Sequence, residues 1–338
     1  MMKNAASVKP FGQCDRLGID VSKATLEVVG IAAYDVWKRT IGNQLTDIER
    51  LAQSLVKAGY LGKIVCESTG HYHLLLALVF ARYGLDLRII NPLQSSKHQT
   101  ARIRKTKTDP VDGYVLATMC ETERDLPKAA NLQPNQVLAR LRQGQLQSLD
   151  KQIQRLSRSL AAYEETYEKL GLEASQSIET IASALTQLRR AKKQLEAELE
   201  SAYLDLAEVD DVAQLQVLPG YSDLMASMVA GAFDRDVKSD RSWIAFAGMD
   251  ISVRESGTWK GRGKITKRGN AFIRKRCYNA AWGAMMNYPE VRRHYDQLRV
   301  RGRHHVEALC IIARKLLRIA YAILVNGKSY DPKIAFPG

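Results

Sequence analysis

Several features that mark common classes of protein are missing from this 338-residue chain. No apolar run approaches the roughly 20 residues that a membrane-spanning helix needs, so we expect no membrane span. The first 14 residues lack the apolar core of a signal peptide and are predicted to be a disordered lead-in. The five cysteines are scattered and form no CxxC pair, which argues against structural zinc or disulfides. The scattered cysteines therefore favour a reducing cytoplasm.

Acidic residues are also scarce relative to basic ones. The chain has 36 Asp and Glu against 50 Lys and Arg, a formal charge of +14. Residues 150–211 contain 13 acids and only 8 bases, so the positive excess is concentrated in the rest of the chain. A basic surface of this size favours a polyanionic partner, of which nucleic acid is the leading candidate.

Residues 15–130 are predicted to form an α/β domain. Apolar and β-branched stretches alternate with helical periods in the order β-β-β-α-β-α-β-α, which is the order of an RNase H-like domain. Residues 43–59 have a helical period, with Thr46 as the expected N-cap and Gly59 at the C-terminal end. The last helix of the domain is expected to start at Asp109-Pro110.

The following two regions are predicted to be helical. Residues 131–211 contain two series of apolar residues at heptad spacing, interrupted only by Lys192. They indicate a coiled-coil hairpin, or arms that pair between protomers, and hence a homo-oligomer. Residues 212–338 are mostly helical and strongly basic, with amphipathic helices expected over 271–288 and 305–325.

Four acidic residues are the leading candidates for catalysis. Asp20 in LGIDVSK and Glu67 in IVCESTG lie on or at the end of apolar strands, while Asp109 and Asp112 in KTDPVDGYVLA share one helical face. Each alone could be a cap or a surface acid. Together, in this topology, they can bind two Mg²⁺ ions, with Mn²⁺ as an alternative, for in-line attack on a phosphodiester. His71 and His73 could assist proton transfer or cap a helix.

Basic residues expected to contact nucleic acid lie in two runs. The first run precedes Asp109 and could otherwise be a solvated loop: Lys97, Arg102, Arg104, Lys105 and Lys107. The second run lies among glycines that allow close approach to a phosphate: Arg254, Lys260, Arg262, Lys264, Lys267 and Arg268. Ser256 lies in this second run, either as a turn residue or as a nucleophile supported by the surrounding cations.

These motifs resemble the DEDD insertion-sequence transposases, a family that includes RNA-guided bridge recombinases and relatives of pilin-gene invertases. The resemblance rests on GIDVSK, CESTG and KTDPVD, followed after the heptad region by FAGMD and GRGKITKRGN. It implies a RuvC-like domain holding the four acids and a C-terminal transposase domain (212–338) in which Ser256 falls on the family's nucleophilic serine.

The resemblance further implies a mechanism and partners. The serine attacks a DNA phosphodiester and forms a phosphoserine, and strands are exchanged through a Holliday-junction-like intermediate. The partners implied are target and donor DNA, a structured guide RNA, and copies of the chain that assemble from dimer to tetramer near the nucleoid.

Three other functions remain open from the sequence. One is a site-specific DNA invertase that needs no guide RNA. Another is a RuvC-like Holliday-junction nuclease using water, against which the basic C-terminal region argues. The last is a non-catalytic nucleic-acid-binding protein, against which the four acids argue.

Overall fold

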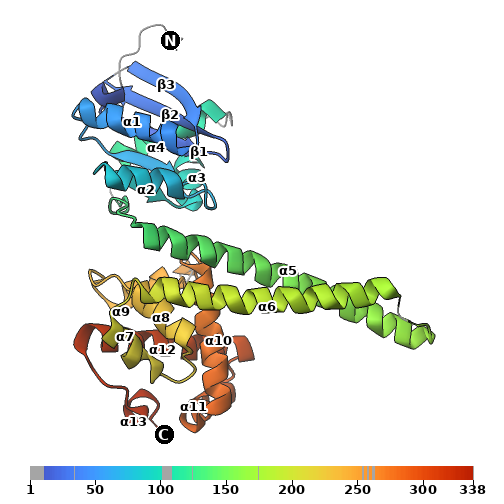
Figure 1. The fold of residues 1–338 in the computed structure, drawn as a ribbon. Helices are drawn as coiled ribbons and strands as arrows, with labels where there is room; N and C mark the ends of the chain where they lie inside the picture. Colours follow the sequence, from blue (N-terminus) through green and yellow to red (C-terminus); the bar gives the residue numbers. More distant parts are fainter. Residues whose placement is uncertain are drawn as a thin grey trace. The chain divides into compact units, whose positions relative to one another are not determined.

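The computed structural model describes residues 11–337 except 34, 101–108, 124, 174, 253–254, 257–258 and 261–262. It describes only the backbone of residues 97, 99, 100, 109–111, 255–256 and 259–260. The chain divides into two units, Met1–Leu141 and Arg142–Gly338 (Figure 1). The domain boundaries expected at 14, 130 and 211 stay predictions. No helix in the described part is long and apolar enough to cross a membrane.

A five-stranded mixed sheet organises the first unit (Figure 1). After a short 3-10 turn at Phe11–Gln13, the strands are β1 Arg16–Val21, β2 Thr25–Ala32, β3 Asp35–Gly42, β4 Ile64–Glu67 and β5 Leu87–Ile90. The order across the sheet is β3-β2-β1-β4-β5; the first three strands are antiparallel, and β4 and β5 run parallel to β1. The parallel β1 and β4 therefore end at the same edge.

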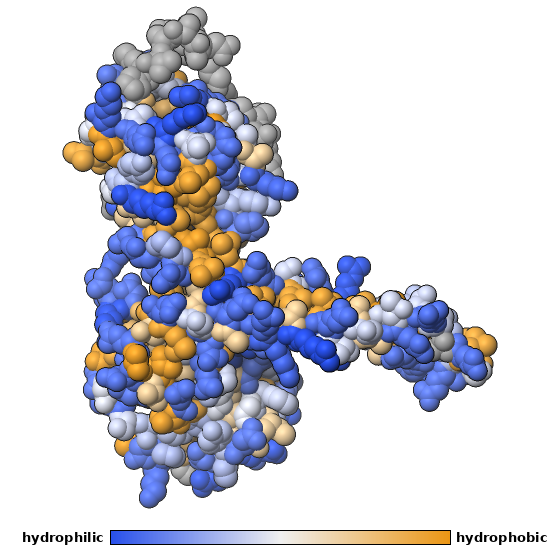
Figure 2. Space-filling model, in the orientation of Figure 1, coloured by the Kyte–Doolittle hydropathy of each residue, from blue (hydrophilic) through white to orange (hydrophobic). Residues whose placement is uncertain are grey.

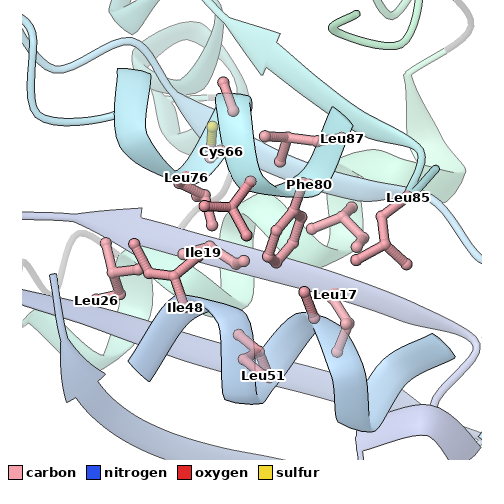
Figure 3. Packing of buried hydrophobic residues seen from close by; sticks show 14 of the residues in the cluster. Leu17, Ile19, Leu26, Ile48, Leu51, Cys66, Leu76, Phe80, Leu85 and Leu87 are labelled. Atoms are coloured by element: carbon pink, nitrogen blue, oxygen red, sulfur yellow. The ribbon is translucent and has the colours of Figure 1, made fainter. Parts of the chain in front are cut away.

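Helices cover both faces of this sheet. Figure 3 shows Leu17 and Ile19 of β1 packed with Ile48 of α1 (Leu45–Lys57) and with Leu76 and Phe80 of α2 (Leu74–Arg82). The opposite face is covered by α4 (Asp109–Thr122), whose apolar residues cluster with Val65 of β4 and Ile90 of β5. Because strand side chains alternate between faces, residues 18 and 20 of β1 point toward α4.

Helix boundaries confirm some predictions and correct others. Gly59 and Gly84 follow α1 and α2 in the left-handed conformation, with φ of +68° at each. Thr46 does not cap α1, because the helix begins at Leu45 and Gln44 is the N-cap. Helix α4 starts at Asp109, as expected. An additional helix, α3 (Pro92–Thr100), which the sequence does not predict, follows β5 and carries Lys97 of the first basic run.

The heptad region forms two long helices, α5 (Pro134–Leu170) and α6 (Gln176–Leu204). Buried Leu160, Ile178 and Leu185 pack together, which makes the pair an antiparallel hairpin. Part of the apolar stripe stays exposed, as Figure 2 shows along the hairpin and at its end; Tyr163 is 59% and Leu170 65% exposed. Supercoiling of the pair stays a prediction.

Lys192 interrupts the heptads because it binds a buried acid. Its Nζ lies 2.7 Å from Oδ1 of Asp150 on α5, and Lys275 Nζ lies 2.7 Å from Oδ2 of the same carboxylate. Lys275 belongs to α10 (Ala271–Asn287) in the helical body of the second unit. This ion-pair cluster therefore joins the hairpin to that body.

The helical body contains the remaining elements. Its other helices are α7 Val209–Gln216, α8 Asp223–Gly231, α9 Asp240–Phe246, α11 Pro289–Val300, α12 His305–Asn326 and α13 Pro332–Ala335. Two short ladders pair β6 (Ile251–Ser252) with β9 (Lys264–Ile265) and β7 (Glu255–Ser256) with β8 (Trp259–Lys260). Helices α10 and α12 match the bounds predicted over 271–288 and 305–325 closely, and α12 is amphipathic whereas α10 has little difference in polarity between its faces.

Candidate active site

A pair of glycines lets α4 approach the centre of the sheet. A Cβ atom on Gly18 would lie 2.1 Å from the carbonyl oxygen of Gly113 and 2.3 Å from the amide nitrogen of Ala117. A Cβ atom on Gly113 would lie 2.7 Å from Cγ2 of Val29. Only residues without a side chain allow the strand and helix backbones to come this close. The contact sets the position of Asp112, the neighbour of Gly113.

Three of the four predicted acids line one cavity. Asp20 from β1, Glu67 from the end of β4 and Asp112 from α4 surround a pocket of about 260 Å³. Its other lining residues are Pro92, Ser95, Ser96 and Leu116. Each of the three carboxylates is half-buried. The cavity therefore lies where the parallel strands β1 and β4 end beneath α4. Asp109 is the first residue of α4, and its side chain lies outside the described residues.

The electrostatics of the cavity disfavour a charged Asp20. Burial raises the pKa of the Asp20 carboxyl, and the nearby Asp112, Glu27 and Glu67 raise it further. Glu27 lies directly opposite Asp20 on β2 and forms an ion pair with Lys38, with Nζ 2.8 Å from Oε2. Carboxylates that repel one another in a half-buried cavity are stabilised by a bound cation.

The donor set of the cavity fits a hard divalent cation, because it consists of carboxylate and hydroxyl oxygens. Among the described side chains, however, no group of three or more His, Cys, Asp or Glu is arranged so that it could hold a metal ion. The Asp109 carboxylate lies outside these described side chains.

Ser95 also lines the cavity, although the sequence does not predict it as a site residue. Its hydroxyl donates to Glu67 Oε2 at 2.5 Å. A capping pattern at the start of α3 could have indicated it: Asn91 Oδ1 accepts from the Leu93 amide, and Gln94 Oε1 accepts from the Asn91 amide. With Pro92 as the first helical residue, this pattern is typical of a helix start.

The two histidines near Glu67 do not reach the cavity lining. His73 is buried at the start of α2, and burial lowers its pKa. His71 packs its ring against Tyr72, with centroids 4.5 Å apart. His73 occupies the N-cap position of α2 without a side-chain cap bond, and a role of either histidine in catalysis stays a prediction.

Ser256 lies on a short ladder in the second unit. It is the second residue of β7 and pairs with Trp259 of β8. Its side chain lies outside the described residues, as do those of Lys97, Arg102, Arg104, Lys105, Lys107, Arg254, Lys260 and Arg262. Lys264, Lys267 and Arg268 are described, and all three are exposed. Their contacts with nucleic acid stay predictions.

The turn that follows β9 is held tightly against α9. Thr266 donates its hydroxyl hydrogen to Asp250, and Lys267 has the left-handed φ of +57°. A Cβ atom on Gly269 would lie 2.2 Å from the Gly248 nitrogen and 2.2 Å from the Phe246 carbonyl oxygen. The glycine of the KRGN motif therefore serves close packing, and it fixes Lys267 and Arg268 on the surface.

The Pro219-Gly220 turn before α8 packs inward. A Cβ atom on Gly220 would lie 2.0 Å from the carbonyl oxygen of Ala280 in α10. Ser222 caps α8 by accepting a hydrogen bond from the Met225 amide. Its hydroxyl thus has a structural role at this turn.

Two family models match this chain. Residues 17–165 match the DEDD transposase model of IS110 elements, and residues 212–296 match the model of the transposase IS116/IS110/IS902 family. The first match contains all four predicted acids, and the second contains Ser256.

Three relatives are similar in sequence. The insertion element IS110 uncharacterized 43.6 kDa protein of Streptomyces coelicolor is 25% identical over 46% of this chain. The insertion element IS900 uncharacterized 42 kDa protein of Mycobacterium paratuberculosis is 26% identical over 34% of this chain. These matches cover 38% and 30% of the two relatives' own lengths. The pilin gene-inverting protein of Moraxella bovis is 23% identical over 94% of this chain and 98% of its own length. Since both family models describe this type of protein and together span most of the sequence, the chain belongs to the IS110 family of insertion-element transposases.

Proposed function

We propose that this protein is a DNA transposase that cuts and rejoins strands of a mobile insertion sequence. The observation that carries the proposal is the cavity at the edge of the sheet, where Asp20, Glu67 and Asp112 meet. The strand order, with three antiparallel strands followed by two parallel ones, supports an RNase H/RuvC-like assignment. Acids at this edge serve phosphodiester chemistry in such folds.

The acids act as a cation site in this proposal. Asp20, Glu67 and Asp112, with Asp109 as the fourth ligand, would hold Mg²⁺ or Mn²⁺. When bound, the ion supplies Lewis-acid stabilisation of the charge that develops on the phosphate. The raised pKa of Asp20 supports this role, because neighbouring carboxylates without a cation disfavour its charged form.

Ser256 is the nucleophile in this proposal. Its hydroxyl oxygen attacks the DNA phosphorus, a P–O bond in the DNA breaks, and the deoxyribose oxygen leaves as a hydroxyl after taking up a proton. The resulting phosphoserine conserves the ester, so a hydroxyl from another strand can reverse the reaction and rejoin the DNA. Exposed Lys264, Lys267 and Arg268 support DNA binding beside this segment.

Guidance by a structured RNA of the element, and assembly into a tetramer, complete the proposal. The exposed apolar residues on the hairpin, including Tyr163 and Leu170, support pairing between copies. DNA as substrate would place the working protein at the nucleoid.

A second candidate is site-specific DNA inversion without a guide. The similarity to the pilin gene-inverting protein favours it, since that match spans nearly the whole of both chains. Purifying the protein with its native locus and sequencing bound nucleic acid separates the two, because a defined stoichiometric RNA supports guidance and its absence supports inversion.

Separate substitutions of Ser256 and of Asp20 test the central proposal. Ser256→Ala should abolish covalent protein–DNA adducts, whereas Ser252→Ala, a matched change of an exposed serine on β6, should leave them intact. Asp20→Asn should abolish metal-dependent cleavage. Adducts that persist in Ser256→Ala contradict the nucleophile, and full activity with a chelator present contradicts the cation site.

A further inference from the structure

We infer that Ser95 is a positioning residue that holds the Glu67 carboxylate in place for the cation; this inference rests on the proposed metal site. Ser95 lies in the first turn of α3 and is only 5% exposed. Its hydroxyl lines the same cavity as Asp20, Glu67 and Asp112. Ser95 lies outside the motifs GIDVSK, CESTG and KTDPVD, which carry the four acids.

The Ser95 hydroxyl has one proton and two acceptors within reach. Glu67 Oε2 lies 2.5 Å from Ser95 Oγ, and the Pro92 carbonyl oxygen lies 2.9 Å away. An O–H···O⁻ bond of this length is typical of a charge-assisted bond to a carboxylate, whereas 2.9 Å is ordinary for a neutral pair. The proton therefore goes to Glu67, and this fixes one of the two carboxylate oxygens.

The helix that carries Ser95 is itself anchored near both ends. The Asn91–Gln94 cap holds its start, and His98 Nδ1 lies 3.2 Å from Glu123 Oε1 just after α4. Ser95 thus approaches Glu67 from a fixed backbone. Outer hydrogen-bond partners of this kind orient ligand carboxylates, and their removal typically weakens metal binding about 10–100-fold.

The test measures Mn²⁺ binding to the full-length protein by calorimetry, without DNA, so that the readout does not depend on catalysis. Ser95→Ala should weaken Mn²⁺ affinity about 10–100-fold. Ser227→Ala is the matched control, because Ser227 is equally helical and buried and donates to the carbonyl three residues earlier, yet lies in the second unit. Its Mn²⁺ affinity should equal that of the wild type.

An isosteric pair keeps the test valid if Ser95→Ala folds poorly. Ser95→Thr and Ser95→Val place the same shape in the cavity, but only threonine keeps the hydroxyl. The threonine variant should bind Mn²⁺ at least about tenfold more tightly than the valine variant. Equal Mn²⁺ affinities of the threonine and valine variants, or an unchanged Mn²⁺ affinity of a folded Ser95→Ala, would overturn the positioning role of Ser95. Either result would leave the proposed metal site standing. A wild type that binds no Mn²⁺ would instead overturn the proposed metal site and this inference with it.

Discussion

Substituting Gly18 by alanine tests whether the close approach of α4 to β1 creates the active site. The new Cβ atom would lie 2.1 Å from the Gly113 carbonyl oxygen, whereas ordinary contacts begin at 3.4 Å. Helix α4 must therefore move by about 1.3 Å or the strand must bend. The obstructing atoms belong to the backbone, so no flexible side chain can relieve the contact.

Two effects of different size should follow. Overpacking of a buried contact costs about 1–3 kcal/mol of folding free energy. Displacement of Asp112 relative to Asp20 should lower activity more severely, because a misplacement of about 1 Å at a reacting centre can cost roughly 100-fold in rate. Gly18→Ala is thus expected to unfold at a lower temperature and to lose most DNA cleavage while remaining folded at 25 °C.

Thermal unfolding and cleavage rate, measured on the same preparations, check this reasoning. The control is Gly144→Ala on α5, where a Cβ atom meets nothing within 4 Å and where alanine stabilises a helix by up to about 1 kcal/mol relative to glycine. Wild-type stability and activity in Gly18→Ala would refute the proposed role of the close contact.

Charged residues provide two further predictions that thermal unfolding can check. Burial and Asp112 raise the pKa of Asp20 in the folded protein. The protonated carboxyl therefore stabilises the fold fully at pH values below the unfolded-state pKa. This stabilisation is lost as the pH rises through the folded-state pKa. Asp20→Asn should therefore raise the melting temperature of the metal-free protein at pH 7, and a fall would contradict this. Burial alone would raise the pKa of Asp150, but hydrogen bonds from Lys192 and Lys275 outweigh it and lower the pKa. Its stabilisation is present above the unfolded-state pKa of about 3.9 and is lost as the pH falls through the folded-state pKa. The difference in melting temperature between wild type and Asp150→Asn should then shrink on acidification, and a difference independent of pH would contradict the ion-pair cluster.

Local sequence signals predict the strands and the helix that carry the four acids, but not α3 between them, and the catalytic role of the acids stays a prediction. Asp20 lies within one short apolar strand, Glu67 is the last residue of another, and the Asp109-Pro110 pair starts a helix, so local signals are enough to place these residues on their elements. Helix α3 was missed because its apolar period is weak and the basic residues around it are typical of a loop. Its start is determined by caps at Asn91 and Gln94, which only a search for capping patterns would have found.

The contacts between distant segments could not be predicted in the same way. Gly18 within a strand suggests a close backbone approach, but nothing in the sequence says that Gly113, 95 positions away, is the partner. Ser95 and Glu67 are likewise 28 residues apart and meet only because α3 follows the end of β5. Such pairs depend on the topology of the sheet rather than on local pattern.

Asp20 and Asp150 also show why contacts between distant segments limit prediction from the sequence. Asp20 stands between the apolar Ile19 and Val21, whereas Asp150 stands between Leu149 and Lys151, and burial by itself favours a raised pKa for both carboxyl groups. For Asp150, Lys192 and Lys275 arrive from two other helices and reverse the direction. For Asp20, the charged groups that arrive among the described residues are further carboxylates, which raise its pKa, and only a backbone hydrogen bond at Val21 acts in the opposite direction. An acid paired with lysines of its own chain stabilises the fold, whereas an acid whose described neighbours are further carboxylates is stabilised in its charged form by a bound cation. Asp150 of the hairpin is thus a structural acid, and Asp20 of the sheet is a candidate catalytic acid. Telling the two apart requires knowing which distant residues pack against each carboxylate, and local sequence does not contain this information.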